Sequence, residues 1–210
     1  MDDRELTKAF IRYLNSLQHI TSDEIPDIDL YMDQVLTFMD THLSETRRYE
    51  SDKVLTKTMI NNYAKNRILP APVAKKYKKD HMIYLIFIYY LKNILSISDI
   101  QTMFSLIRSL YPEGSSEISM PDAYDRIVES MKGEMFRTVK DISHKLFESN
   151  KLFSDLKDPV EKDRLATFTY LCMLGFDVYL KKQLMERIID NIRAEEADAE
   201  KERKEKNPRK

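Results

Sequence analysis

Four polar side chains recur at steps of three and four in a short stretch of the chain: Lys57, Asn61, Asn62 and Lys65. On a helix, residues with this spacing share one face. An asparagine can make two hydrogen bonds to adenine in the major groove of DNA, and a lysine can contact guanine or a phosphate. This pattern is typical of a helix that reads double-stranded DNA.

Basic side chains continue in the segment that follows. Two prolines in Ile68–Val73 prevent the helix from continuing and stiffen the connection to a lysine-rich stretch. We expect this stretch to hold the phosphate backbone. Two alternatives stay open. Tyr63 and Tyr77 could pack in the core instead of contacting DNA, and Asn66 could serve only as a helix C-cap. The candidate DNA-binding residues outside the helix are Arg67, Lys75, Lys76, Tyr77, Lys78 and Lys79.

The formal net charge of −1 conceals an uneven distribution. Residues 1–46 carry 3 basic and 10 acidic side chains, residues 47–92 carry 11 and 3, and residues 93–210 carry 20 and 22. Phosphate attraction depends on charge within about 10 Å of the contact, so the middle segment can attract an anion despite the neutral total. The alternative is that these lysines only solvate helix surfaces or pair with the acidic first segment.

Composition points to an all-α, mainly helical fold. The chain has 3 glycines, whereas the average usage of about 7% predicts roughly 15. Hairpin turns and phosphate-binding loops depend on glycine, so a β-sandwich, a barrel and a glycine-rich nucleotide site are poorly supported. A charged fraction of 33% beside an apolar fraction of 42% fits helices with one buried face.

Apolar periodicity and capping residues locate the helices. Thr56 is a suitable N-cap, and Ser96 with Asp99 forms a capping-box variant that opens a further helix. Residues 193–210 have almost nothing to bury, which predicts a helix end that frays into disorder. The other predicted helices span residues 4–18, 29–43, 57–66, 80–93, 121–148 and 159–192.

Residues 25–110 resemble the DNA-binding half of the MerR-type winged helix-turn-helix regulators. The matching positions are Ile60, Tyr63, Ile68–Pro70, Lys75, Tyr77, Ser96 and Ile100. With Ile28–Gln34 upstream and Leu55–Tyr63 at the centre, the chain is also similar to an uncharacterised bacterial family of unknown function that carries this unit. Arg67 stands where the regulators have glycine, so either Arg67 adopts a left-handed conformation or the turn differs.

The resemblance implies a sequence-specific transcription regulator that binds double-stranded DNA as a homodimer. It divides the chain into an N-terminal helix (1–24), a MerR-like DNA-binding domain (25–110), a helical region for dimerisation or effector binding (117–195) and a charged, disordered tail (196–210). The linker Tyr111–Ser116 separates the second and third units. The alternative is a non-catalytic interaction module whose winged unit has lost DNA binding and docks an acidic partner. A small-molecule effector is compatible with the resemblance, but no motif identifies it.

No residue pattern predicts an enzyme, a cofactor or a metal site. The four histidines are scattered, His81 is interpreted as a cap or surface residue, and Cys172 lies in an apolar run that predicts a packed thiol. The longest apolar run, Met82–Leu91, is too short to cross a membrane, and a secretory signal is not evident, so we expect a cytoplasmic protein. Residues interpreted mainly as core in the second half are Met120, Met131, Met135, Phe136, Phe147, Phe153, Phe168 and Phe176.

Overall fold

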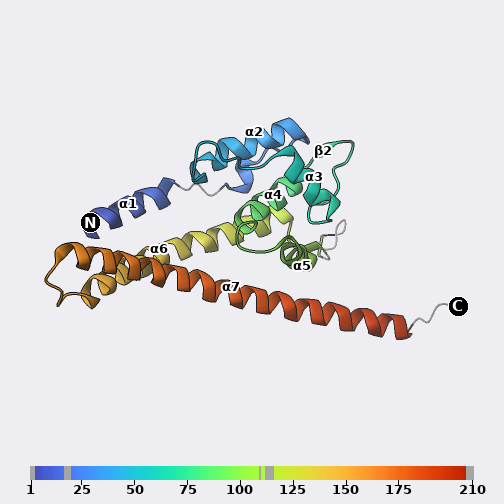
Figure 1. The fold of residues 1–210 in the computed structure, drawn as a ribbon. Coiled ribbons are helices and arrows are strands. Elements are labelled where there is room, and N and C mark those ends of the chain that lie inside the picture. The colour runs from blue at the N-terminus through green and yellow to red at the C-terminus, as the bar shows by residue number, and fades with distance from the viewer. Residues whose placement is uncertain (1–2, 17–19, 109, 112–115, 207–210) are drawn as a thin grey trace.

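The computed structural model describes residues 3–16, 20–108, 110–111 and 116–206, and these ranges form a mainly helical protein with one two-stranded sheet (Figure 1). This confirms the fold class. The helices are α1 (Asp3–Ser16), α2 (Met32–Leu43), α3 (Lys57–Lys65), α4 (Lys79–Leu91), α5 (Ile97–Arg108), α6 (Met120–Leu152) and α7 (Pro159–Lys206). The remaining elements are the 3-10 turns η1 (Ser22–Glu24) and η2 (Ser44–Thr46) and the strands β1 (Leu30–Tyr31) and β2 (Lys76–Tyr77).

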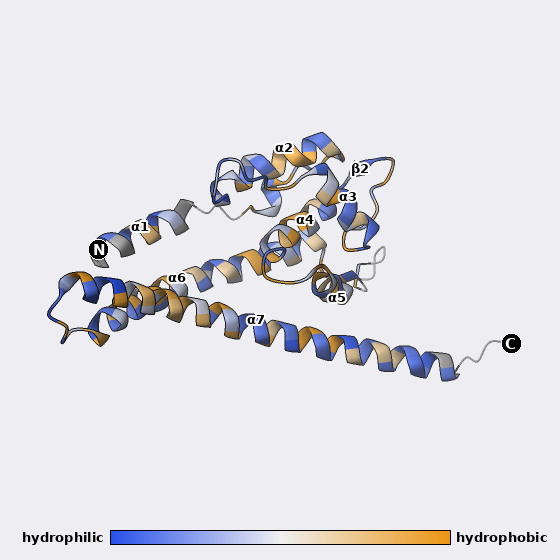
Figure 2. Ribbon diagram, in the orientation of Figure 1, coloured by the Kyte–Doolittle hydropathy of each residue, from blue (hydrophilic) through white to orange (hydrophobic). Residues whose placement is uncertain are grey.

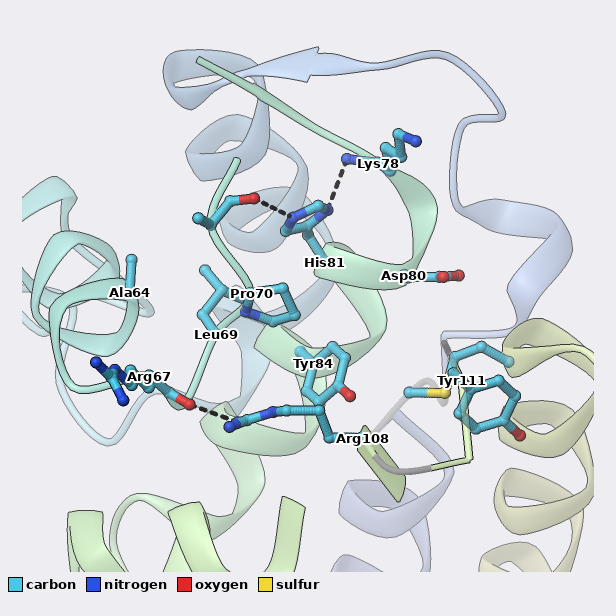
Figure 3. Close-up of a pocket in the computed structure, with 12 residues that line it drawn as sticks. Ala64, Arg67, Leu69, Pro70, Lys78, Asp80, His81, Tyr84, Arg108 and Tyr111 are labelled. Carbon is cyan, nitrogen blue, oxygen red and sulfur yellow. Dashed lines mark hydrogen bonds between the residues drawn. The ribbon is translucent and has the colours of Figure 1, made fainter. Parts of the chain in front are cut away.

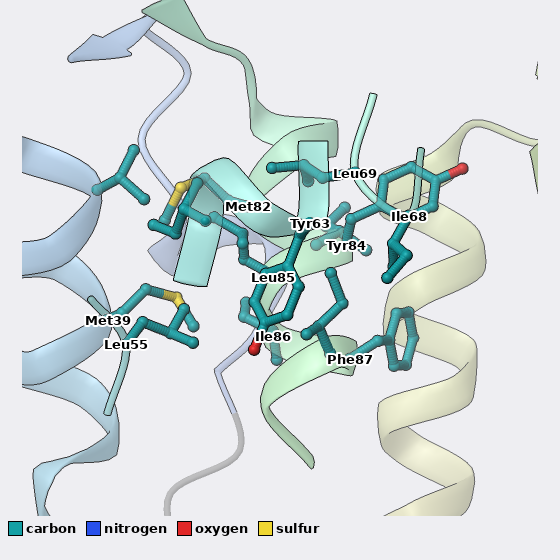
Figure 4. Close-up of a cluster of buried hydrophobic side chains, with 14 of the residues drawn as sticks. Met39, Leu55, Tyr63, Ile68, Leu69, Met82, Tyr84, Leu85, Ile86 and Phe87 are labelled. Carbon is teal, nitrogen blue, oxygen red and sulfur yellow. The ribbon is translucent and has the colours of Figure 1, made fainter. Parts of the chain in front are cut away.

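α4 is the centre of the core, because all eight residues from His81 to Ile88 are buried. Figure 2 shows this helix coloured as hydrophobic, and Figure 4 shows side chains from α2, α3 and the following loop gathered around it. Burial of each large apolar side chain contributes about 1.5–3 kcal/mol, so a helix that is apolar on every side is stable only when other elements surround it.

Local signals predicted the starts of α3 and α5 correctly. The Thr56 hydroxyl accepts a hydrogen bond from the backbone N–H of Met59 at 3.2 Å, as an N-cap does. The Ser96 hydroxyl accepts from the N–H of Asp99, and the Asp99 carboxylate accepts from the N–H of Ser96, both at 3.1 Å. The second predicted helix begins later than expected, because Leu30 and Tyr31 form β1.

The buried core continues across the predicted linker, Tyr111–Ser116. The Tyr124 hydroxyl on α6 donates to the carbonyl of Ile20 at 2.6 Å, and the N–H of Ser22 donates to the Asp125 carboxylate at 2.8 Å. The start of α6 therefore belongs to the same core as α2–α5. Residues 112–115 of the linker lie outside the described residues.

α7 is longer than predicted. It continues to Lys206, so residues 196–206, expected to be disordered, are helical, whereas 207–210 lie outside the described residues. Alanine, glutamate, lysine and arginine dominate this stretch and have high helix propensity.

Arg193 connects α7 to α5, because its guanidinium contacts the Asp99 carboxylate at 2.7 Å and the Thr102 hydroxyl at 3.0 Å.

Several side chains of α6 and α7 that were predicted to be core are exposed. The exposed fraction is 82% for Phe136, 65% for Phe168 and 58% for Phe176, and Cys172 is also exposed. The prediction was wrong at these positions because the later part of α6 and the first part of α7 form an antiparallel pair that extends beyond α2–α5, and each covers only one face of the other (Figure 1).

Candidate nucleic-acid interface

α3 presents a continuous polar face to solvent. Its apolar side chains Ile60 and Tyr63 are buried against the core, 0% and 4% exposed, which fixes the orientation of the helix. The four predicted contacts are all exposed on the opposite face, together with a threonine that the sequence interpretation missed. The exposed residues of this face are Lys57, Thr58, Asn61, Asn62 and Lys65.

The turn after α3 is a Schellman motif with a non-glycine residue in the left-handed position. The N–H of Ile68 donates to the Tyr63 carbonyl at 2.9 Å, and the N–H of Arg67 donates to the Ala64 carbonyl at 3.1 Å. Arg67 has a φ of 56°. Of the two alternatives for this glycine-free turn, the left-handed arginine is therefore confirmed. Asn66 is the C-cap of α3, with its amide bonded to the Asn62 carbonyl at 2.8 Å.

A two-residue hairpin turn carries the lysine-rich stretch. Val73 and Lys76 exchange two backbone hydrogen bonds of 2.9 and 3.1 Å, and the two residues between them, Ala74 and Lys75, have φ values of 51° and 64°. Positive φ at both central positions is the geometry of a type I′ turn. β2 then pairs antiparallel with β1, opposite Tyr31 and Leu30. We call residues 73–79 the lysine hairpin.

Side chains of the lysine hairpin divide between surface and interior. Lys75 and Lys78 are exposed, whereas Tyr77 is 4% exposed and packs edge-on against His81. Tyr77 cannot contact DNA from this position, so its assignment as a contact was wrong. Successive side chains of a strand point to opposite faces, which sends Tyr77 inward between two exposed or half-buried lysines.

Two lysines of the hairpin already have partners within the chain. The Lys79 ammonium lies 2.6 Å from the Asp27 carboxylate, and the Lys76 ammonium lies 5.3 Å from the centre of the Tyr31 ring. The acidic first segment therefore neutralises one hairpin charge directly. Within the described part of the chain, no ion pair is formed by Lys57, Lys65, Arg67, Lys75 or Lys78.

A second basic cluster lies between the segment before α3 and the end of α4. Four cations and Asp52 line a hollow of about 330 Å³, where the Lys92 ammonium donates to the Val54 carbonyl at 2.6 Å. Burial lowers the pKa of Lys92. The charge excess of residues 47–92 included these side chains, but their spacing matched no motif, so none was singled out. The four cations are Arg47, Arg48, Lys53 and Lys92.

His81 ties the base of the lysine hairpin to α4. Its Nδ1 accepts a hydrogen bond from the N–H of Lys78 at 3.0 Å, and its Nε2 lies 3.4 Å from the Ala71 carbonyl. This pattern requires neutral imidazole with the proton on Nε2. Burial lowers the pKa of His81 below 6.5, although the Ala71 hydrogen bond opposes this. The interpretation of His81 as a cap is confirmed.

The described ranges contain neither a metal-binding cluster nor a membrane-spanning helix. Among these residues, no group of three or more histidine, cysteine, aspartate or glutamate side chains is placed to hold a metal ion. No described helix combines the length and the hydropathy needed to span a bilayer.

The chain is thus a mainly helical protein in which α3 and the lysine hairpin both expose basic side chains. It belongs to the family described as a domain of unknown function (DUF1836), whose model matches residues 20–127, just over half of the chain. The matched region begins at Ile20 and includes Tyr124, so it contains both ends of the hydrogen bond that ties α6 to the core. Comparisons with curated proteins and with solved structures each gave no match.

Glycine should affect the stability differently at Arg67 and at Lys65, which are two residues apart. A left-handed conformation costs an L-residue about 1–2 kcal/mol, and glycine removes this cost. Glycine also gives the unfolded chain more conformational entropy, which offsets part of the gain. Arg67→Gly should therefore leave the free energy of unfolding unchanged or raise it by up to about 1 kcal/mol. Lys65→Gly, at the last residue of α3, should lower it by about 0.5 kcal/mol. Urea denaturation followed by circular dichroism compares the two. Equal losses would contradict the left-handed turn.

The free energy of unfolding should fall on acidification because of His81. Its folded pKa lies below its unfolded value of 6.5, so the unfolded state binds the proton more readily and stability is lost as the pH falls below about 6.5. His81→Gln keeps a side-chain acceptor for the Lys78 N–H but does not titrate. Urea midpoints at about pH 7.5 and about pH 5.5 should therefore differ more for the wild type than for this variant. Equal differences would exclude His81 as the cause.

Proposed function

We propose that the protein is a non-catalytic transcription regulator that binds specific double-stranded DNA sites in the manner of MerR-type winged helix-turn-helix proteins. In this proposal α3 reads the major groove and the lysine hairpin holds the phosphate backbone, in a homodimer in the cytoplasm. The supporting observation is the exposed face of α3, which carries two asparagines and two lysines. Neither lysine forms an ion pair with another described residue.

The dimensions of α3 suit this role. An α-helix with its side chains is about 10–12 Å across, and the major groove is about 12 Å wide. Because Ile60 and Tyr63 anchor α3 on the core, the polar face is held outward before any ligand arrives. Preorganisation of this kind lowers the entropy lost on binding.

The two parts of the surface should contribute differently. Asn61 and Asn62 can make paired hydrogen bonds to bases, each worth about 1–3 kcal/mol of discrimination. Lys75 and Lys78 are ammonium groups at the exposed part of the hairpin, where they can contact phosphates of any sequence. Removal of an asparagine should therefore reduce specificity, and removal of a hairpin lysine should reduce affinity for all DNA.

Site variants test this division on a fragment selected from genomic DNA by the wild-type protein. Asn61→Ala should weaken binding to that fragment by about 5- to 150-fold and leave binding to unrelated DNA nearly unchanged. Lys75→Ala should weaken binding to both and reduce the slope of log affinity against log salt by about 1. Fluorescence anisotropy between about 0.05 and 0.2 M salt measures both quantities.

Lys140→Ala is the matched control, because Lys140 is an exposed lysine on α6. It should change neither the affinity nor the salt slope. If Asn61→Ala and Lys75→Ala also bind as the wild type does, α3 and the lysine hairpin are not the interface.

The homodimer part of the proposal is supported by an uncovered apolar face on α7. Residues 165–180 contain one charged side chain, Asp177, which faces α6 and lies 2.5 Å from the Lys145 ammonium. On the opposite side, Phe168, Leu171 and Tyr179 are 53–65% exposed. A contiguous apolar patch of this kind marks an interaction site, and paired half-sites in DNA favour a second copy as its partner.

A charge in this face should dissociate the dimer. Leu171→Glu should weaken self-association at least about tenfold, because the glutamate would be desolvated at the interface. Asn191→Glu adds the same charge at an exposed position of α7 beyond the apolar stretch and should have no effect. Sedimentation velocity at micromolar concentration measures the association. A monomeric wild-type protein would remove the homodimer from the proposal.

The interaction module is kept as a second candidate because of the contact between Asp27 and Lys79. This ion pair and the β1–β2 pairing show that part of the acidic first segment lies on the lysine hairpin. An external acidic protein could use the remaining lysines in the same way. Under this alternative, DNA binding dissolves with salt and shows no preference for any fragment.

A further inference from the structure

A hollow of about 590 Å³ lies between the end of α3, the base of the lysine hairpin and the helices α4, α5 and α6 (Figure 3). Pockets for small molecules usually measure about 300–1,000 Å³ and are lined mainly by apolar groups with a few polar ones. This hollow has that composition. Its apolar lining includes Pro70, Tyr84, Tyr111 and Met120.

The charges around the hollow favour an anion. Arg67, Lys78 and Arg108 line it, against one carboxylate, Asp80. His81 also lines it and is neutral in the hydrogen-bonding pattern described above. An arginine can bind a carboxylate through two parallel hydrogen bonds, and a proline or tyrosine side chain gives a flat apolar body something to pack against.

The hollow connects the two parts of the candidate DNA interface. Arg67 ends the turn after α3, and Lys78 is the residue before α4 in the lysine hairpin. Arg108, from the end of α5, donates hydrogen bonds to the carbonyls of Arg67 and Ile68, as Figure 3 shows for Arg67. A molecule seated here would touch both α3's terminal turn and the hairpin base.

We infer that this pocket binds a small organic anion with a flat apolar body, an aromatic carboxylate, and that occupancy alters DNA binding by changing how α3 and the lysine hairpin are held. Ligand binding depends only on the pocket. The effect on DNA rests on the proposed function. A ligand changes the DNA affinity only if it binds the DNA-competent and the free arrangements unequally.

Methyl resonances of the methionines provide a direct test in the full chain. Protein labelled at the methionine methyl groups is titrated with 2-naphthoate and, separately, with the neutral analogue 2-naphthamide. The Met120 methyl should shift and saturate with 2-naphthoate at a dissociation constant below about 1 mM, and 2-naphthamide should bind at least about fivefold more weakly. Met39, buried in the core and not among the pocket residues, is the internal control.

Charge variants localise the site. Arg67→Asn removes a cation but keeps a residue that tolerates positive φ, and it should weaken 2-naphthoate at least about fivefold. Lys140→Gln removes an exposed lysine on α6, outside the pocket, and should leave the affinity for 2-naphthoate unchanged. The pocket assignment is overturned by an unsaturated Met120 shift, by equal affinity for the amide, by equal shifts at Met39, or by equal losses in both variants.

A separate measurement addresses regulation. Saturating 2-naphthoate should change the affinity for the selected DNA fragment by at least about threefold, with 2-naphthamide as the reference. An unchanged affinity overturns the regulatory part. A chain that binds no DNA overturns the proposed function, and the methionine titration still decides whether the pocket binds the anion.

Discussion

Burial of α4 on every side from His81 to Ile88 is the constraint on which the rest of the structure depends. From Met82 to Ile88 the helix has no side that tolerates water, so α2, α3, α5 and the start of α6 must cover it. α3 contributes Ile60 and Tyr63 to this cover, and its asparagines and lysines are left on the outside. The polar face of α3 is therefore a consequence of core packing, and it is as rigid as the core that holds it.

Backbone conformation at three non-glycine residues shapes the basic surface. Arg67 reverses the chain after α3, and Ala74 with Lys75 makes the tight turn of the lysine hairpin. Such conformations cost L-residues energy, so they persist because surrounding contacts hold them. At Arg67 those contacts are the Schellman hydrogen bonds and the guanidinium of Arg108. At the hairpin they are the Val73–Lys76 pair and the β1–β2 pairing.

Sequence patterns predicted what depends on neighbours in the chain, and they missed what depends on distant ones. The Thr56 cap and the exposed face of α3 follow from local spacing, and the structure agrees. The pairing of Lys79 with Asp27 joins residues 52 positions apart. The charge distribution left a pairing with the acidic first segment open, but no local pattern identifies these two partners. Periodicity on α7 identifies an apolar face at Phe168 but not whether another helix covers it. Local patterns do not predict pockets either, because the walls of a pocket come from separate elements.

Arg67 is the residue at which these features meet. Its side chain is exposed beside the polar face of α3, its carbonyl is held by Arg108, and its backbone sets the direction of the chain toward the lysine hairpin. Any group that competes for Arg108 changes the support of this turn. Because packed interiors switch between discrete arrangements rather than deform continuously, a small change there would shift α3 and the hairpin together. Arg67 is thus the position at which the proposed DNA binding and the proposed ligand binding would be coupled.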